Sequence, residues 1–340
     1  MGLAFWRQDT SGAETGYCLF GKLPRRADFV RVNATAPVAH EYDQLLAKTI
    51  TSLAQDPGWE TAYDITAATL FAYQGRDRQG WLFGGQCPSN DQQGRRFPLV
   101  GGITRSTAKI AANLPLVPLA YEVFYSGLVN HLENAVTNSV DAVTLRSFLE
   151  GFANANMQVE SDFELPDRLL RQFTATHTVN DLLLILRSAY PHASLEQALL
   201  NIAFYANFLR HFPQAGTAQE IVLPLPADVG TAALAASAWL RLIGGLAGDA
   251  RRICGFFFRR DVLVVAIDLF SDNFSPLLPL THSAKGRGLM LTAEHEAWRA
   301  HPFYPEIRYA LKRLISEPDV PLQAVFECAE QIGSRLLSSE

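Results

Sequence analysis

The chain has 340 residues, 48% of them apolar and only 19% charged, which is enough apolar material for a sizeable core. Its net charge of −5 argues against a nucleic-acid-binding protein, since such proteins usually carry a basic excess. The four cysteines lie far apart and form no CxxC pair. This spacing argues against a zinc knuckle or a disulfide framework and fits reduced thiols in a cytosol.

The sequence shows no targeting pattern. Residues 2–9 lack a basic leader followed by an apolar core and a cleavage site. The strongest spanning candidate, residues 229–240, is cut off after 12 residues by Arg241, whereas a bilayer crossing needs about 20 residues. We therefore expect a cytoplasmic protein without direct membrane insertion.

The first hundred residues predict mixed helix and strand. An apolar run at 17–20 indicates a strand, and helical spacing over 37–56 predicts a helix that begins near a proline. Further strands are predicted in 80–89 and, after a proline, in 95–106. Asp28 stands where the N-cap of a helix could be.

The rest of the chain is helical first and then returns to strands. Residues 116–215 carry apolar side chains three to four residues apart, with Ser194 and Gln197 as a predicted capping box. Strands are expected in "EIVLPLP", "ICGFFFR" and "VLVVAIDLF", with a helix before the last two. The tail, interrupted by prolines, is again helical and amphipathic.

These elements predict a layered α/β protein. In a strand, alternate side chains point to opposite faces, so Phe257 should face away from Phe256 and Phe258, and both faces need cover. We expect a three-layer α/β/α sandwich with a mixed sheet, a helical middle region and a helical C-terminal tail. The predicted regions, in one compact unit, are 1–115 (N-terminal α/β), 116–215 (helical layer or insert), 216–280 (returning strands) and 281–340 (helical tail).

Motifs of catalysis or cofactor binding are missing from the sequence. It contains no GxxxxGK[ST], GxGxxG, HExxH or GxSxG motif, and "LVGGITRS" lacks the lysine and glycine spacing of a phosphate loop. Of the eight histidines, only His295 and His301 are close neighbours. We therefore expect no cofactor, no metal site and no catalytic residue.

Two segments combine glycine, proline and charge: "FGKLPRRADFVRVN" at 20–33 and "CPSNDQQGRRFPL" at 87–99. The second is rich in residues that form turns through side-chain bonds to nearby backbone. Together the segments resemble the TagF family, also called ImpM, of type VI secretion accessory proteins. The matching residues are Gly21, Lys22, Leu23, Pro24, Asp28, Phe29 and Val30, then Ser89, Asp91, Gly94, Arg95, Phe97, Pro98 and Leu99.

The resemblance covers about residues 16–104, and "ASAWLRLIGGL" with the two strands after it is a weaker echo. It implies an α/β/α fold and a non-enzymatic protein that represses the secretion system post-translationally. Its partner would be the forkhead-associated scaffold protein, Fha, or another component of the machine. The helical middle and the tail depart from the family pattern, and nothing indicates the metal-dependent phosphatase domain that some relatives carry.

The residues in the two segments allow a structural and a functional interpretation. Asp28 and Arg95 are expected to form a pair that locks the first loop to the second, while Lys22, Arg25 and Arg26 display charge to a partner. Pro24, Ser89 and Asp91 shape the loops, and we expect the two segments side by side on one edge of the sheet. Phe29, Phe97 and Leu99 are expected in the core.

Two alternatives remain open. One is a hydrolase that uses Asp28 or Asp91 as a base beside Lys22 and Arg95, in the charged loops 21–28 and 89–96. The other is an adaptor that promotes assembly of the secretion machine, because the sign of regulation depends on which state of the partner is favoured.

Overall fold

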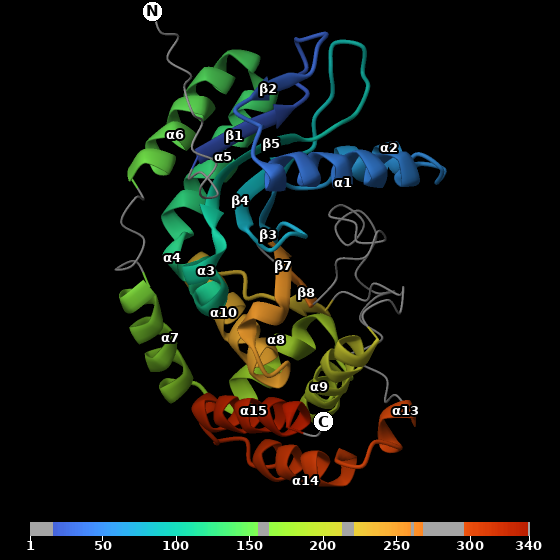
Figure 1. The fold of residues 1–340 in the computed structure, drawn as a ribbon, viewed down its shortest axis with the longest axis vertical. Helices are drawn as coiled ribbons and strands as arrows, with labels where there is room; N and C mark the ends of the chain where they lie inside the picture. Colours follow the sequence, from blue (N-terminus) through green and yellow to red (C-terminus); the bar gives the residue numbers. More distant parts are fainter. Residues whose placement is uncertain (1–15, 156–162, 213–220, 260–261, 268–295, 339–340) are drawn as a thin grey trace, which may run out of the picture.

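A computed structural model describes residues 16–155, 163–212, 221–259, 262–267 and 296–338. At its centre is one eight-stranded sheet with the strand order β2-β1-β5-β4-β3-β7-β8-β6 (Figure 1). The strands are β1 (Gly16–Gly21), β2 (Val30–Val32), β3 (Thr69–Gln74), β4 (Gly80–Cys87), β5 (Leu99–Ser106), β6 (Ile221–Pro224), β7 (Ile253–Phe258) and β8 (Val262–Ile267). The α-helices are α1 (Pro37–Leu53), α2 (Trp59–Asp64), α3 (Thr107–Asn113), α4 (Val117–Ala120), α5 (Glu122–Thr137), α6 (Ala142–Ala155), α7 (Glu164–Thr176), α8 (Val179–Ala189), α9 (Leu195–His211), α10 (Val229–Leu246), α13 (Glu296–Arg299), α14 (Tyr304–Ile315) and α15 (Leu322–Leu337). Short 3-10 helices are η1 (Leu114–Leu116), η2 (Ser139–Asp141) and η4 (Ala250–Arg252).

The prediction of an α/β fold is confirmed, but the prediction of a mixed sheet is wrong. Every strand pair among the described residues is antiparallel. The physical reason lies in the connections. A short turn reverses the chain between β3 and β4, only three residues separate β7 from β8, and a strand that returns after so short a connection pairs antiparallel. The helical crossovers, such as α1 and α2 between β2 and β3, join strands that are not neighbours in the sheet.

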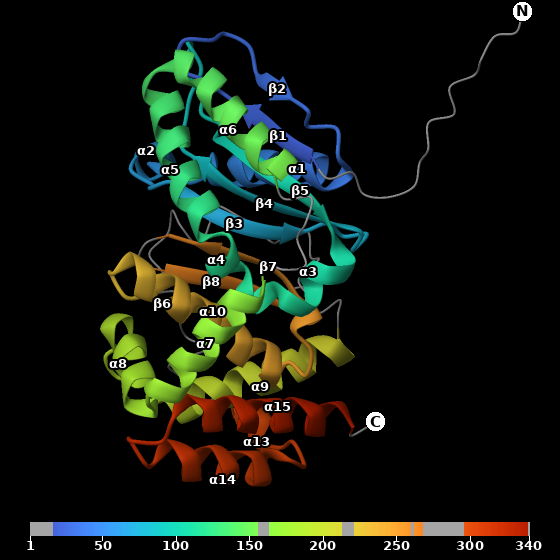
Figure 2. The same cartoon turned by 90° about the vertical axis from the view of Figure 1, so that its left-hand side faces the viewer.

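Helices cover both faces of the sheet around its centre. On one face α1 contributes Tyr42, which stacks on Phe71 of β3 with 4.4 Å between ring centroids. On the opposite face α5 contributes Tyr125, whose hydroxyl donates to the Phe71 carbonyl at 3.0 Å. Phe257 lies on the α1 face beside Phe71, whereas Phe258 packs on Tyr125. The expected alternation along this strand is confirmed, and Figure 2 shows α5 and α6 in front of the sheet with α1 behind it.

Glycines in β4 and β5 allow helices to approach the sheet closely. Gly85 and Gly101 are directly paired across the two strands. A Cβ atom at Gly85 would lie 2.9 Å from a methyl group of Leu132 in α5, and one at Gly101 would lie 3.2 Å from Leu149 in α6. This close approach holds the α5–α6 layer against the half of the sheet that carries β1 and β2.

The remaining helices gather at the opposite end of the molecule. In Figure 2, α9, α15 and α14 follow one another beyond the β6 edge of the sheet. The indole nitrogen of Trp239 in α10 donates to the Pro224 carbonyl of β6, and Arg252 donates to the Ala206 carbonyl of α9 at 2.6 Å. None of the helices in the described part of the chain combines the length and the apolar character that a bilayer crossing requires.

Most of the predicted elements are confirmed. Ser194 is the N-cap of α9, where its hydroxyl accepts the Gln197 backbone N–H at 3.4 Å, while a full capping box is found at Thr178 and Asp181 of α8. Within the described residues, the predicted helical middle is present as α4 to α9 and the predicted helical tail as α13 to α15. His295 and residues 268–295 lie outside the described residues. The division into four regions stays a prediction.

Candidate functional site

The two charged segments meet at one end of the sheet. β1 and β4 are both antiparallel to β5, so the residues that follow β1 and β4 emerge beside the start of β5. We call the loops 22–29 and 88–98 together the loop junction. The Ser89 hydroxyl donates to the Lys22 carbonyl at 2.7 Å, and the Gln92 N–H donates to the Arg26 carbonyl at 3.0 Å. The predicted contact of the segments is confirmed, although it lies at the strand ends and not along the edge strand.

A close backbone contact fixes where the first loop leaves the sheet. Gly21, the last residue of β1, has φ of 128°, a value that residues with a side chain rarely adopt. A Cβ atom here would lie 2.1 Å from the Pro98 carbonyl oxygen, on the residue that precedes β5. The glycine is therefore required both by its conformation and by the space available.

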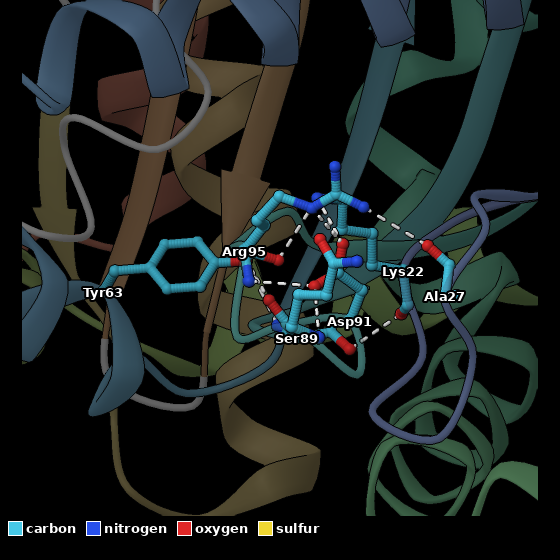
Figure 3. A network of polar contacts seen from close by, with 7 residues as sticks. Lys22, Ala27, Tyr63, Ser89, Asp91 and Arg95 are labelled. Carbon is cyan, nitrogen blue, oxygen red and sulfur yellow. Dashed lines mark hydrogen bonds and ion pairs between the residues drawn. The ribbon is translucent and has the colours of Figure 1, made fainter.

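Asp91 is the centre of the polar contacts in the junction (Figure 3). Its side chain is fully shielded from solvent, and Oδ2 lies 3.0 Å from Lys22 Nζ and 2.7 Å from Arg95 Nε. Oδ1 accepts the backbone N–H groups of Gln93 at 3.0 Å and Arg95 at 2.9 Å. Burial alone would raise the pKa of the Asp91 carboxyl, but these hydrogen bonds outweigh burial and hold the pKa well below its usual range.

A buried tyrosine ties the second loop to α2. The Tyr63 hydroxyl donates to the Ser89 carbonyl at 3.2 Å and accepts the Ser89 N–H at 3.1 Å. Arg96 in the same loop pairs with Asp64 at 2.7 Å and Glu60 at 2.9 Å, both from α2. No sequence motif assigned these α2 residues to the site. The only signal was the spacing of the two acids, four residues apart on one helix.

Two predictions about the first loop are wrong. Asp28 caps no helix, because Val30–Val32 continues as strand β2. Among the described residues Asp28 forms no pair with Arg95, which instead binds Asp91 and donates to the Ala27 carbonyl at 3.3 Å. Asp91 lies four residues before Arg95 in the same loop and accepts the backbone N–H groups of Gln93 and Arg95. Because these hydrogen bonds hold the Asp91 carboxylate in place, it is a better partner for the Arg95 guanidinium than Asp28.

The apolar residues of the junction are divided between core and surface. Leu99 is fully buried as predicted, and Phe97 is half-buried. The prediction that Phe29 belongs to the core is wrong, because 37% of this residue is exposed. The first loop ends in β2, which is an edge strand and has a neighbouring strand on only one side. The Phe29 ring contacts the Phe97 ring edge-on, with 5.1 Å between the ring centroids.

Of the remaining predicted residues, Pro24, Arg25 and Arg26 belong to the outer side of the junction, whereas Lys22 lies inside it. Pro24 and Arg25 form the turn closed by the hydrogen bond from the Arg26 N–H to the Leu23 carbonyl at 3.0 Å. Arg25 and Arg26 are exposed, and neither forms an ion pair within the described part of the chain. Lys22 is directed inward with 15% of its side chain exposed, whereas 60% of the Arg95 side chain is exposed.

This arrangement limits the chemistry that the junction can perform. A general base works best with a pKa near the working pH, and the Asp91 carboxylate has a lowered pKa and two cations bound to it. Its side chain is also closed off from solvent. Across the described ranges, no group of three or more histidine, cysteine, aspartate or glutamate side chains is placed to hold a metal ion. The junction is a filled, ion-paired contact with charge on its outer side.

Comparisons with known proteins bear on the same part of the chain. Residues 18–152 match the model of the TagF N-terminal domain, described as type VI secretion system-associated. The chain is also similar to PA0076 from Pseudomonas aeruginosa PAO1, a solved crystal structure, with 23% identity and a TM-score of 0.31. That match covers 35% of this chain and 54% of PA0076, about half of its length. No curated protein matches. The resemblance to the TagF family is thus confirmed for residues 18–152, which match the type VI secretion-associated TagF N-terminal domain and contain both loops of the junction.

Proposed function

We propose that this protein regulates a bacterial type VI secretion system post-translationally, as a repressor, by binding the Fha-type scaffold or a component of the membrane complex. The loop junction is the docking surface, and the protein acts in the cytoplasm without catalysing a reaction. The match of residues 18–152 to the TagF N-terminal domain supports the link to secretion, because that domain is described as type VI secretion system-associated. The matched residues contain both loops.

The observation that carries the proposal is the construction of the junction. Two loops more than sixty residues apart in the chain are held together by side chains that are buried or turned inward, while arginines are left on the outside. A loop that is already rigid loses little conformational freedom on binding and therefore makes a better docking element. The exposed charges would steer association and select the partner.

The hydrolase alternative has weaker support. It needs Asp91 or Asp28 as a base, but Asp91 is shielded and stabilised as a carboxylate by its neighbours. Asp28 is exposed and has no described ion-pair partner that would place it beside Lys22 or Arg95. The adaptor alternative uses the same surface and differs only in the sign of the effect.

A binding experiment with a matched control tests the proposal. The purified full chain is titrated with the purified scaffold, and the Arg25→Ala/Arg26→Ala variant is compared with Lys312→Ala/Arg313→Ala. The second pair is exposed on α14, at the opposite end of the molecule (Figure 2). We expect weaker binding only for the first variant. If neither scaffold nor membrane-complex components bind the wild type, the proposal is wrong.

The sign of regulation is measured in cells. Effector secretion is compared between the parent strain, a strain without the gene and a strain that overproduces the protein. If the protein is a repressor, deletion of its gene raises effector secretion and its overproduction lowers effector secretion. The opposite pattern would establish the adaptor, and unchanged secretion in both strains would remove the proposed role.

A further inference from the structure

The outer side of the junction carries a local excess of positive charge. Inside the junction the Asp91 carboxylate is shared by two cations, Lys22 and Arg95, and Arg25, Arg26 and Asp28 are exposed on the outside. Apart from Arg96, which pairs with Glu60 and Asp64 of α2, the two loops carry four cations and two carboxylates, an excess of positive charge on a chain whose net charge is −5. We call Arg25, Arg26 and Arg95, with the neighbouring Phe29, the arginine surface.

An aromatic side chain is presented beside these charges. Phe29 is 37% exposed as a residue, and its ring is supported on one side by Phe97. The Arg31 guanidinium carbon lies 5.6 Å from the Phe29 centroid, a cation–π distance, and the same guanidinium is paired with Asp43 of α1. The ring is therefore held in place while part of it faces solvent. Aromatic residues and arginine are enriched in protein–protein interfaces and among the residues that dominate binding energy.

We propose that the arginine surface binds an acidic segment of its partner, in which aspartate or glutamate side chains flank an apolar or aromatic residue. Arg25 and Arg26 bind the carboxylates through paired N–H groups, and Phe29 contacts the apolar residue. The inference rests on the proposed function in taking that partner to be a secretion component. It adds the chemistry by which the partner is recognised.

The size of the patch favours a protein segment over other polyanions. Nucleic-acid binding draws its affinity from many phosphate contacts, and a membrane-binding basic cluster usually holds about four to eight lysines and arginines. Three exposed arginines on an acidic chain fall short of both. An acidic peptide with one apolar residue requires only a few charges and one aromatic contact, which this surface provides.

The test uses the full chain and fluorescein-labelled peptides, with binding measured by anisotropy. One peptide alternates aspartate and glutamate around a central phenylalanine, and its control has asparagine and glutamine at the same positions. We expect the acidic peptide to bind, and Arg25→Ala/Arg26→Ala or Phe29→Ala to weaken it about tenfold or more. Lys312→Ala/Arg313→Ala should leave the affinity unchanged. Raising the salt from about 50 to about 300 mM should weaken binding, since exposed charges are screened.

Several results would overturn the inference. These are equal binding of the neutral peptide, full affinity in the Arg25→Ala/Arg26→Ala variant, or tighter arginine-dependent binding of single-stranded DNA or phosphatidylserine vesicles. Thermal melts of each variant show whether a loss of binding comes from unfolding. If the scaffold binds wild type and the arginine variant equally, the inference fails while the proposed function stands. If the acidic peptide binds through the arginines but no secretion component does, the proposed function fails.

Discussion

Replacing Tyr63 with phenylalanine isolates one buried contact that holds the junction together. The hydroxyl of Tyr63 makes two hydrogen bonds to the backbone of Ser89, and both residues are buried, with 1% and 6% exposed. After Tyr63→Phe the Ser89 carbonyl still accepts the Phe97 N–H at 3.0 Å, but the Ser89 N–H loses its partner. A buried donor left without a partner costs about 1–3 kcal/mol, so the free energy of unfolding should fall by that amount.

The expected change is measurable by thermal and urea unfolding. With an unfolding entropy of about 2.1 cal/mol/K per residue, a chain of this length should lose about 1.5–4 °C in Tm. Tyr309→Phe is the matched control, because this tyrosine is 71% exposed and its substitution should stay within about 0.5 kcal/mol of wild type. Hydrogen exchange should also quicken in residues 88–98. If Tyr63→Phe is as stable as Tyr309→Phe, the second loop is not held by α2 in the way described.

Three further outcomes are expected. Gly21→Ala should lower the free energy of unfolding by at least about 1–3 kcal/mol, because the backbone conformation is strained for alanine and the new Cβ meets the Pro98 carbonyl. Gly94→Ala is the control: Gly94 also has a positive φ, but nothing lies within 4 Å of the added Cβ, so the loss of stability in the same urea titration should be smaller. Equal losses of stability would contradict the clash at Gly21. Asp91→Asn should lower Tm at neutral pH. Because the pKa of Asp91 is depressed in the folded protein, the stabilisation by its carboxylate is present above the unfolded pKa of about 3.9, and the difference in Tm between wild type and variant should shrink as the pH falls below that value. A difference in Tm that does not change with pH would argue against the ion pairs. Burial raises the pKa of Cys18 to about 12, so this thiol should resist iodoacetamide in the native protein and react only after unfolding, as mass spectrometry of the labelled peptide would show.

Local patterns were sufficient to predict most elements. The apolar run that became β1, the helical spacing of α1 and the alternation in Phe256–Phe258 each depend on contacts within a few residues, and the structure confirms them. The antiparallel pairing was missed because it depends on which strands become neighbours. That choice is made by long-range packing, including the close approach of α5 and α6 over Gly85 and Gly101.

The candidate site was predicted in outline but not in its pairings. The two segments were expected to meet, and they do, yet Arg95 was assigned to Asp28 when its partner is Asp91. Residue spacing in the sequence did not decide between Asp28 and Asp91 as the partner of Arg95. The preference for Asp91 comes from backbone N–H groups that only the folded loop directs at it. The contribution of Tyr63 could not be predicted either, since a tyrosine in a short helix carries no signal of its partner.

The most direct test of the docking surface is hydrogen exchange of the full chain with and without the purified Fha-type scaffold, followed peptide by peptide. We predict that residues 22–29 and 88–98 become protected together in the complex, while α14 and α15 at the other end of the molecule are unchanged. Protection confined to α14 and α15, with both loops exchanging as in the free protein, would contradict the assignment of the junction as the surface that meets the partner.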